Sequence, residues 1–180
     1  MGTPEFAVPS LEALLGSEDH VVGVVTQPDR PKGRGHQLVA PPVKLVAERA
    51  GIPLLQPLKI RTPEFLQALS AWQPDLIAVT AFGRILHMPI LRLPPMGCVN
   101  VHGSLLPKYR GAAPVQWAVI NGETKTGITT MLMDEGMDTG PMLLQEELDI
   151  SLDDTAGTLA PRMAELGGQL LIKTIAQLKA

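Results

Sequence analysis

An amide and an imidazole lie two residues apart at the end of one apolar segment. Asn100 and His102 close the run of residues 98–102, and Gly103 follows directly. Residues two apart in a strand point to the same face, so the two side chains project together. Both can donate hydrogen bonds to an oxygen that becomes negative when a carbonyl is attacked. An isolated Asn-x-His is more often a capping asparagine beside a structural histidine, so the pair needs support from the rest of the sequence.

A second candidate is the acidic turn at residues 133–140, which lies between two expected strands. It contains Asp138 and two further carboxylates, and its glycines let the backbone approach a ligand or another loop closely. A carboxylate from this turn can orient His102 and accept a proton from an attacking amine. Taken alone, the same residues also fit an ordinary acidic turn. The Asp-Thr-Gly at 138–140 occurs in aspartic proteases as well, but those sites need a second such aspartate and an all-β fold.

Positive charge is concentrated in the segment of residues 27–36. Arg30, Lys32 and Arg34 alternate there with prolines and glycines, in a chain whose formal net charge is −3. Such side chains can contact phosphates while the glycines let the backbone adapt. A solvated surface loop is the alternative, and the sequence favours neither. The chain has no glycine-rich dinucleotide or nucleoside-triphosphate motif, and its four histidines lack the spacing of metal ligands.

Length and composition indicate one globular domain. The 180 residues can bury a sizeable core, and 45% of them are hydrophobic. The single Cys98 excludes an intrachain disulfide and a thiolate metal cluster. No apolar run approaches the roughly 18 residues of a membrane span, and the first residues do not form a signal peptide. We therefore expect a reduced, cytoplasmic and monomeric protein without a metal site.

Periodicity predicts strands separated by helices. A first helix begins near Phe6 and ends at Gly16. The expected strands cover residues 21–25, 76–80, 98–102, 126–133 and 142–150. The further helices cover residues 43–50, 63–71, 114–120 and 155–178, and the last of them is interrupted near Gly167-Gly168. A long loop covers residues 27–42. This order predicts an α/β domain over residues 1–180, with a mostly parallel sheet flanked by helices. The last two strands have no helix between them, which allows one to run antiparallel at the edge.

The beginning of the chain departs from the usual order of such domains. A doubly wound domain usually begins with a strand, and its first ligand-binding loop follows that strand. Here Met1 leads at once into Gly-Thr-Pro and a helix. We expect either a sheet that lacks one central strand or residues that precede Met1.

Four motifs, in order, resemble the methionyl-tRNA formyltransferases, a branch of the folate-dependent formyltransferase family. They are Gly-Thr-Pro-Glu-Phe at 2–6, Gln-Pro-Asp-Arg-Pro-x-Gly-Arg-Gly at 27–35, Asn-Val-His-Gly-Ser-Leu-Leu-Pro-x-x-Arg-Gly-Ala-Ala-Pro at 100–114, and Met-Asp-x-Gly-x-Asp-Thr-Gly at 133–140. The resemblance covers nearly the whole chain, and Gln-Pro-Asp-Arg-Pro is the motif most particular to this branch. It implies a Rossmann-like formyltransferase fold that acts in translation initiation. The implied donor is 10-formyltetrahydrofolate, and the implied acceptor is the amino group of initiator methionyl-tRNA.

The resemblance also implies roles for individual residues. The family's catalytic Asn, His and Asp fall on Asn100, His102 and Asp138. Its folate-contacting residues fall on Ser104, Leu105, Leu106 and Pro107, with Phe82, Gly83 and Leu86 in a segment that helps wall the same pocket. Its acceptor-stem loop falls on residues 27–41, where Arg30, Lys32 and Arg34 are the expected tRNA contacts.

Two departures from the family's pattern keep alternatives open. Only Met1-Gly2 correspond to the family's first strand, and its C-terminal β-barrel domain has no counterpart before Ala180, which leaves full activity of this chain open. Formyltransferases for an amino-sugar nucleotide or a purine precursor would share the catalytic residues, but the basic loop argues against them. A formyltetrahydrofolate hydrolase, with water as acceptor, would share them too. A non-catalytic folate- or RNA-binding module is the alternative from a different class.

Overall fold

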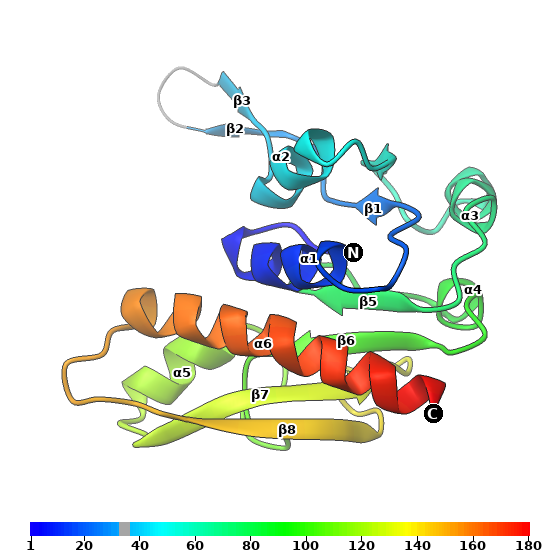
Figure 1. The fold of residues 1–180 in the computed structure, drawn as a ribbon. Helices are drawn as coiled ribbons and strands as arrows, with labels where there is room; N and C mark the ends of the chain where they lie inside the picture. The colour runs from blue at the N-terminus through cyan, green and yellow to red at the C-terminus, as the bar shows by residue number, and fades with distance from the viewer. Residues whose placement is uncertain (33–36) are drawn as a thin grey trace.

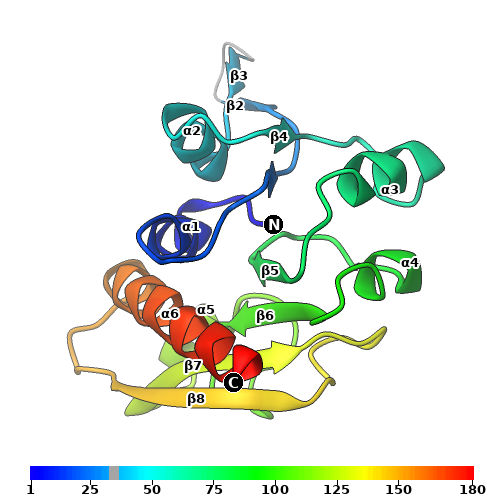
Figure 2. The same cartoon turned by 45° about the vertical axis from the view of Figure 1, so that its right-hand side comes forward.

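The strands of the domain run side by side with helices on both faces (Figures 1 and 2). The structure is a computed structural model that describes residues 1–32 and 37–180. A four-stranded sheet has the order β5 (Ile77–Thr80), β6 (Cys98–His102), β7 (Lys125–Leu132) and β8 (Met142–Asp149). Beside it, β1 (Val24–Val25) pairs in parallel with β4 (Leu54–Leu55), and β2 (Arg30–Lys32) and β3 (Gln37–Val39) form an antiparallel hairpin.

The direction of the strands confirms the expected fold class with one change. β5 and β6 are parallel, as are β1 and β4, whereas β7 is antiparallel to both of its neighbours. The one antiparallel strand therefore lies inside the sheet and not at its edge. A turn joins β7 to β8, so these two strands form an antiparallel hairpin. Strand β8 therefore runs in the same direction as β6.

Met1 and Gly2 connect the two groups of strands. The backbone N–H of Gly2 donates to the carbonyl oxygen of Val25 at 3.1 Å, and that of Thr80 donates to the carbonyl oxygen of Met1 at 2.9 Å. Gly2 and Thr80 also form a parallel bridge. The order across the whole sheet is thus β4, β1, Met1–Gly2, β5, β6, β7 and β8. The sheet has a central position, and two residues occupy it.

Prolines and threonines mark the starts of several helices. The helices are α1 (Val8–Leu15), which follows a 3-10 turn (Glu5–Ala7), α2 (Pro42–Arg49), α3 (Pro63–Ser70), α4 (Met88–Leu91), α5 (Pro114–Ile120) and α6 (Ala156–Lys179). Thr62 caps α3 by accepting a hydrogen bond from the N–H of Phe65, as its place before Pro63 predicts. Thr155 caps α6 in a reciprocal arrangement with Thr158.

Helix α6 continues without a break through Gly167 and Gly168, so the interruption expected there is wrong. A methyl group on Gly167 would lie 2.9 Å from Cγ1 of Val101, and one on Gly168 would lie 2.7 Å from the carbonyl oxygen of Pro9. These glycines let α6 approach β6 and the start of α1 closely. Their small size serves packing and not the end of a helix.

Side chains alternate along β6 between two faces of the sheet. Cys98 belongs to an apolar cluster that includes side chains of α3 and α4. Val99 and Val101 belong to another cluster, to which α6 contributes Leu159 and Met163. Figure 2 shows α6 on one face and α3 and α4 on the other. Because alternate residues of a strand face opposite sides, Asn100 and His102 project on the side of Cys98.

Several short elements differ from those that periodicity predicts. The expected long loop at 27–42 contains the hairpin of β2 and β3, and β4 and α4 are further elements that were not expected. The strand expected at 21–25 is reduced to Val24–Val25. Pro31 fits in β2 because a two-stranded hairpin leaves one edge of each strand free, so the missing N–H costs no ladder bond. No helix in the described part of the chain is long and apolar enough to cross a membrane.

Candidate active site

Two of the three expected catalytic residues lie at the carboxyl end of β6. Asn100 and His102 are almost fully buried, at 9% and 6% exposure. They share one face of the strand, next to β5, which ends in parallel with β6 at Thr80. In open α/β sheets this end of neighbouring parallel strands is where ligands bind. Strand periodicity therefore places an amide and an imidazole together at that edge.

The third residue, Asp138, reaches the same place from the turn between β7 and β8. Its backbone is left-handed, with φ of 52°. One carboxylate oxygen accepts a hydrogen bond from Nδ2 of Asn100 at 3.3 Å, and the other accepts one from the backbone N–H of Gly111 at 2.7 Å. The second oxygen also lies 3.5 Å from Nδ1 of His102. The structure thus brings Asn100, His102 and Asp138 into one cluster.

Contacts of the imidazole define its tautomer. Nε2 of His102 lies 2.8 Å from the carbonyl oxygen of Tyr109. A carbonyl oxygen only accepts, so Nε2 carries the hydrogen in the neutral ring and Nδ1 faces Asp138 with its lone pair. Protonation of Nδ1 would place a second N–H toward the carboxylate. The cluster can therefore take up a proton at His102 and balance the new charge with Asp138.

Tyr109 is a site residue that sequence reasoning missed. Its backbone is left-handed, with φ of 56°. Its hydroxyl donates to Glu123 at 2.7 Å and accepts a hydrogen bond from Nδ2 of Asn121 at 2.9 Å. The hydrogen bond from Tyr109, followed by that from Lys108, lowers the pKa of Glu123 below its usual value. These contacts hold the ring and so fix the carbonyl that His102 meets. No residue-type pattern could have signalled a role that a backbone oxygen performs.

The expected folate-contacting loop follows His102 and is tied to the sheet. The hydroxyl of Thr129 donates to the carbonyl oxygen of Ser104 at 2.7 Å and accepts from the N–H of Leu106 at 3.0 Å. Nε2 of Gln145 donates to the carbonyl oxygen of Leu106 at 2.9 Å. Ser104 and Leu106 are buried, Leu105 is half-buried and Pro107 is exposed. The loop is anchored from β7 and β8, and Leu105 and Pro107 are its more accessible members.

The other expected wall of the folate pocket follows β5. The side chains of Phe82 and Leu86 are buried in the apolar cluster of α3 and α4, whereas Gly83 is exposed. Nε2 of Gln27 donates to the carbonyl oxygen of Phe82 at 2.9 Å, and the hydroxyl of Thr3 lies 3.4 Å from the same oxygen. A methyl group on Gly83, whose φ is 75°, would lie 2.6 Å from Nε2 of Gln27. Gly83 and nearby backbone, and not the two apolar side chains, face outward here.

The basic segment of residues 27–36 leads into the β2–β3 hairpin, which is separate from the cluster of Asn100, His102 and Asp138. Arg30 is exposed at its base, where its guanidinium contacts the side chain of Gln27. Lys32 ends β2, and Arg34 lies outside the described residues. Asp29 before the hairpin accepts hydrogen bonds from Lys44 of α2, and this contact lowers the pKa of the Asp29 carboxyl. A hollow of about 320 Å³ lies beside the hairpin and is lined by, among others, Thr3, Gln27, Arg30, Val39, Pro41 and Ala81.

The chemistry of the cluster of Asn100, His102 and Asp138 depends on polar groups that are largely shielded from water. Across residues 1–32 and 37–180, no group of three or more His, Cys, Asp or Glu side chains is placed to hold a metal ion. Burial raises the pKa of the Cys98 thiol to about 12, so it is not a nucleophile at neutral pH. An amide donor, an imidazole and a carboxylate remain. They can stabilise an oxyanion and accept a proton, which is what acyl transfer to an amine requires.

Comparison with known proteins gives a consistent result. The family model described as Formyl transferase matches residues 1–175. A methionyl-tRNA formyltransferase from Desulfotalea psychrophila is 65% identical to this chain over an alignment that covers 99% of the chain and 55% of that protein. One from Trichlorobacter lovleyi is 59% identical over 99% of the chain and 57% of that protein. The chain thus spans about half the length of the curated relatives it matches.

Solved structures share the fold across different activities. Phosphoribosylglycinamide formyltransferase from Bacillus halodurans superimposes with a TM-score of 0.80 at 25% identity, over 98% of this chain and 92% of that chain. A formyltetrahydrofolate deformylase from Pseudomonas syringae gives a TM-score of 0.71 at 20% identity, over 95% of this chain and 58% of that chain. The second likeness concerns the fold alone.

Proposed function

The chain belongs to the formyl transferase family, and from this premise we propose that it transfers the formyl group of 10-formyltetrahydrofolate to the amino group of initiator methionyl-tRNA. The observation that carries the proposal is the convergence of Asn100, His102 and Asp138 at the carboxyl end of β6. The similarity to methionyl-tRNA formyltransferases supports the choice of acceptor. We place this reaction in the cytoplasm, at the start of translation, and on a monomer.

In the proposed reaction the amine lone pair attacks the formyl carbon. The new carbon–nitrogen bond turns the formyl oxygen into an oxyanion, and the bond from that carbon to the folate nitrogen then breaks. Asn100 has two hydrogens on Nδ2, one of which Asp138 accepts, so the other is free for the oxyanion. One such donor contributes about 10²–10³ in kcat. The attacking amine loses a proton to the His102–Asp138 pair, and the folate nitrogen takes one up as it leaves.

Two loops support the proposed folate site. The segment after β5 and the segment after β6 lie next to each other because these strands are parallel neighbours. Gly83 and Leu105 offer the accessible surface, and backbone groups held by Gln27 and Thr129 give the loops a fixed shape. Fixed backbone donors and acceptors can read one edge of a flat heterocycle.

The β2–β3 hairpin supports a nucleic acid as acceptor. It extends from the sheet (Figure 1), and β2 contains Arg30 and Lys32, with Arg34 two residues further along the sequence. Cationic side chains on an extended arm can contact phosphates along an acceptor stem. A small acceptor such as water or a single nucleotide needs no such arm.

The test measures the acceptor and the site together. The chain is incubated with 10-formyltetrahydrofolate and initiator methionyl-tRNA, and formylmethionyl-tRNA is measured. His102→Ala and Asp138→Asn should each lower kcat at least roughly 100-fold while the chain stays folded. Glu135→Gln is the matched control, because this exposed carboxylate belongs to the same turn and should leave kcat unchanged.

The same assay distinguishes the alternatives. Release of formate without any amine acceptor would indicate a hydrolase, and formylation of glycinamide ribonucleotide would indicate the purine enzyme. Binding of folate or tRNA without formyl transfer, in a chain that is folded, would support a non-catalytic module. Activity that survives Asp138→Asn would contradict the proposed site whatever the acceptor.

A further inference from the structure

The segment between β6 and α5 reaches the candidate active site through its backbone. The carbonyl oxygen of Tyr109 lies 2.8 Å from Nε2 of His102, and the N–H of Gly111 donates to Asp138 at 2.7 Å. Two of the three expected catalytic side chains therefore depend on the position of one short stretch of main chain. The contacts that hold this stretch decide how precisely the imidazole and the carboxylate are placed.

The backbone of Tyr109 has a conformation that needs support. Its φ of 56° lies in the left-handed region, as does the φ of 58° at Ala113. For residues other than glycine this region is sparsely populated, and it persists where surrounding contacts hold it. On the side of the sheet, the buried hydroxyl of Ser104 donates to the carbonyl oxygen of Lys108 at 2.5 Å. A second support acts through the side chain of Tyr109.

This second support is Glu123, which lies between α5 and β7. Its own N–H donates to the carbonyl oxygen of Ala118 at 3.0 Å, so its backbone is fixed to α5. Its carboxylate accepts from the hydroxyl of Tyr109 at 2.7 Å and from Nζ of Lys108 at 3.0 Å. Nδ2 of Asn121 donates to the same hydroxyl at 2.9 Å, so the tyrosine ring is held from two sides.

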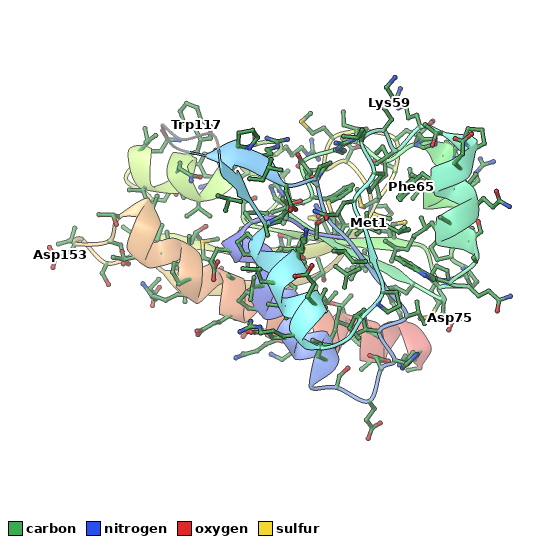
Figure 3. All side chains as sticks on the ribbon, turned by 90° about the horizontal axis from the view of Figure 1, so that it is seen from above. Met1, Lys59, Phe65, Asp75, Trp117 and Asp153 are labelled. Carbon is green, nitrogen blue, oxygen red and sulfur yellow. The ribbon has the colours of Figure 1, made fainter. Side chains whose placement is uncertain are left out.

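The charge and the location of Glu123 suit this role. Because the hydrogen bonds from Tyr109 and Lys108 lower the pKa of Glu123, the carboxylate is ionised at neutral pH and only accepts. A hydrogen bond to a charged acceptor is stronger than one between neutral groups. The side chain is 26% exposed and follows α5, whose Trp117 is half exposed at one end of the molecule (Figure 3). Glu123 belongs to none of the three apolar clusters, so its replacement should leave the core intact.

The carbonyl of Tyr109 decides which nitrogen of His102 carries the hydrogen. With the carbonyl in place, Nε2 keeps the hydrogen, and Nδ1 directs its lone pair toward Asp138 at 3.5 Å. If the carbonyl moves away, the neutral ring gains by placing its hydrogen on Nδ1, where the carboxylate accepts it. Nδ1 would then no longer accept a proton from an attacking amine.

We propose that Glu123 is a positioning residue: through Tyr109 it holds the carbonyl that keeps the hydrogen of His102 on Nε2 and leaves Nδ1 free to accept the proton of the attacking amine. Glu123 lies outside all four motifs that resemble the formyltransferases, so the contacts alone point to it. The consequence for kcat rests on the proposed function, whereas the consequence for the tautomer does not.

The first test measures the tautomer of His102 by nitrogen NMR, on a folded, histidine-labelled chain without any substrate, with His102→Gln to assign the signals. Glu123→Ala should populate the form with hydrogen on Nδ1. Glu123→Gln keeps an oxygen that accepts from Tyr109, and it should restore hydrogen on Nε2. Glu147→Ala is the matched control, because this exposed carboxylate also pairs with a lysine, Lys125. Hydrogen on Nδ1 in the unaltered chain, or an unchanged tautomer in Glu123→Ala, would overturn the proposal.

Kinetics give the second test. Glu123→Ala should lower kcat for formyl transfer roughly 3- to 10-fold, as the loss of one hydrogen bond predicts, and leave the KM for folate unchanged. Combining it with Tyr109→Phe should cost no more than either change alone, because both remove the same hydrogen bond. Additive losses would count against the proposal. If Glu123→Ala does not fold, Tyr109→Phe takes its place in the NMR comparison. If the unaltered chain transfers no formyl group, the proposed function fails, while the tautomers still decide the role of Glu123.

Discussion

In a chain whose first residue is Met1, the amino group of that residue should make the free energy of unfolding depend on pH between about 6 and 8. Burial lowers the pKa of this group from its usual 8.0 to about 6, against a smaller opposing effect of Cys98. The unfolded chain therefore binds one more proton than the folded chain in this range. Stability rises with pH wherever the unfolded state binds more protons. It should be full above pH 8 and should fall as the pH decreases toward 6.

The size of the effect follows from the two pKa values. A difference of two pKa units corresponds to about 3 kcal/mol, at roughly 1.4 kcal/mol for each unit. This is a large part of the total stability of an ordinary domain, which is about 5–15 kcal/mol. Below pH 6 both states carry the charge, so this contribution should become constant.

The assay compares the free amine with a chain acetylated at Met1. Acetylation removes the charge and keeps an N–H that can donate to the carbonyl oxygen of Ala78. Urea unfolding is measured from pH 5 to pH 9 on chains whose retained Met1 is checked by mass. All other titratable groups, including the four histidines, are common to both chains and cancel in the difference. Relative to the acetylated chain, the free-amine chain should lose about 2 kcal/mol between pH 8 and pH 6, and about 3 kcal/mol over the whole range from pH 9 to pH 5. A difference that does not vary with pH, or that grows toward high pH, would refute the burial of this amine.

Three further predictions concern the site, the hairpin and the packing of α6. Tyr109→Phe should lower kcat for formyl transfer several-fold with little change in the KM for folate. The reason is that the change frees the side chain of the residue whose backbone carbonyl orients the imidazole of His102. An equal loss of folate binding would contradict a positioning role. Arg34→Ala should weaken tRNA binding and reduce its salt slope by about 0.7–0.9, whereas Lys59→Ala should change neither, as binding measured at several salt concentrations would show. Gly168→Ala should destabilise the fold by about 1–3 kcal/mol, because its methyl would lie 2.7 Å from a backbone oxygen. Gly157→Ala in the same helix has 3.6 Å of room and should be neutral or stabilising in urea unfolding.

Much of the fold could be predicted where a pattern acts within one element. The apolar run at 98–102 and the helix at 114–120 have the predicted bounds, because strand alternation and a proline at the first helical position are local signals. The role of Gly167 and Gly168 could not be read in the same way. A glycine that ends a helix and a glycine that lets two elements touch look alike until the partner, here Val101 or Pro9, is in place.

The same distinction between local patterns and long-range contacts applies to the candidate site. Alternation alone places Asn100 and His102 on one face of β6, and the structure agrees. Asp138 reaches them through a left-handed turn between two other strands, so only the resemblance of motifs could predict its part. Tyr109 was missed because its contact with His102 is made by the backbone. The roles of all these residues in catalysis stay predictions until the variants are measured.

Residues 1–3 connect the middle of the sheet to the candidate active site. Met1 and Gly2 lie between β1 and β5, and Thr3 follows them directly. The hydroxyl of Thr3 accepts from the N–H of Gln27 at 3.3 Å and lies 3.4 Å from the carbonyl oxygen of Phe82, at the start of the expected folate wall. The pairing of Gly2 with Val25 and Thr80 therefore also fixes Thr3, and through it the backbone at Phe82. Because the proposed formyl transfer needs its groups held to within a fraction of an ångström, these contacts should favour the reaction as well as the fold.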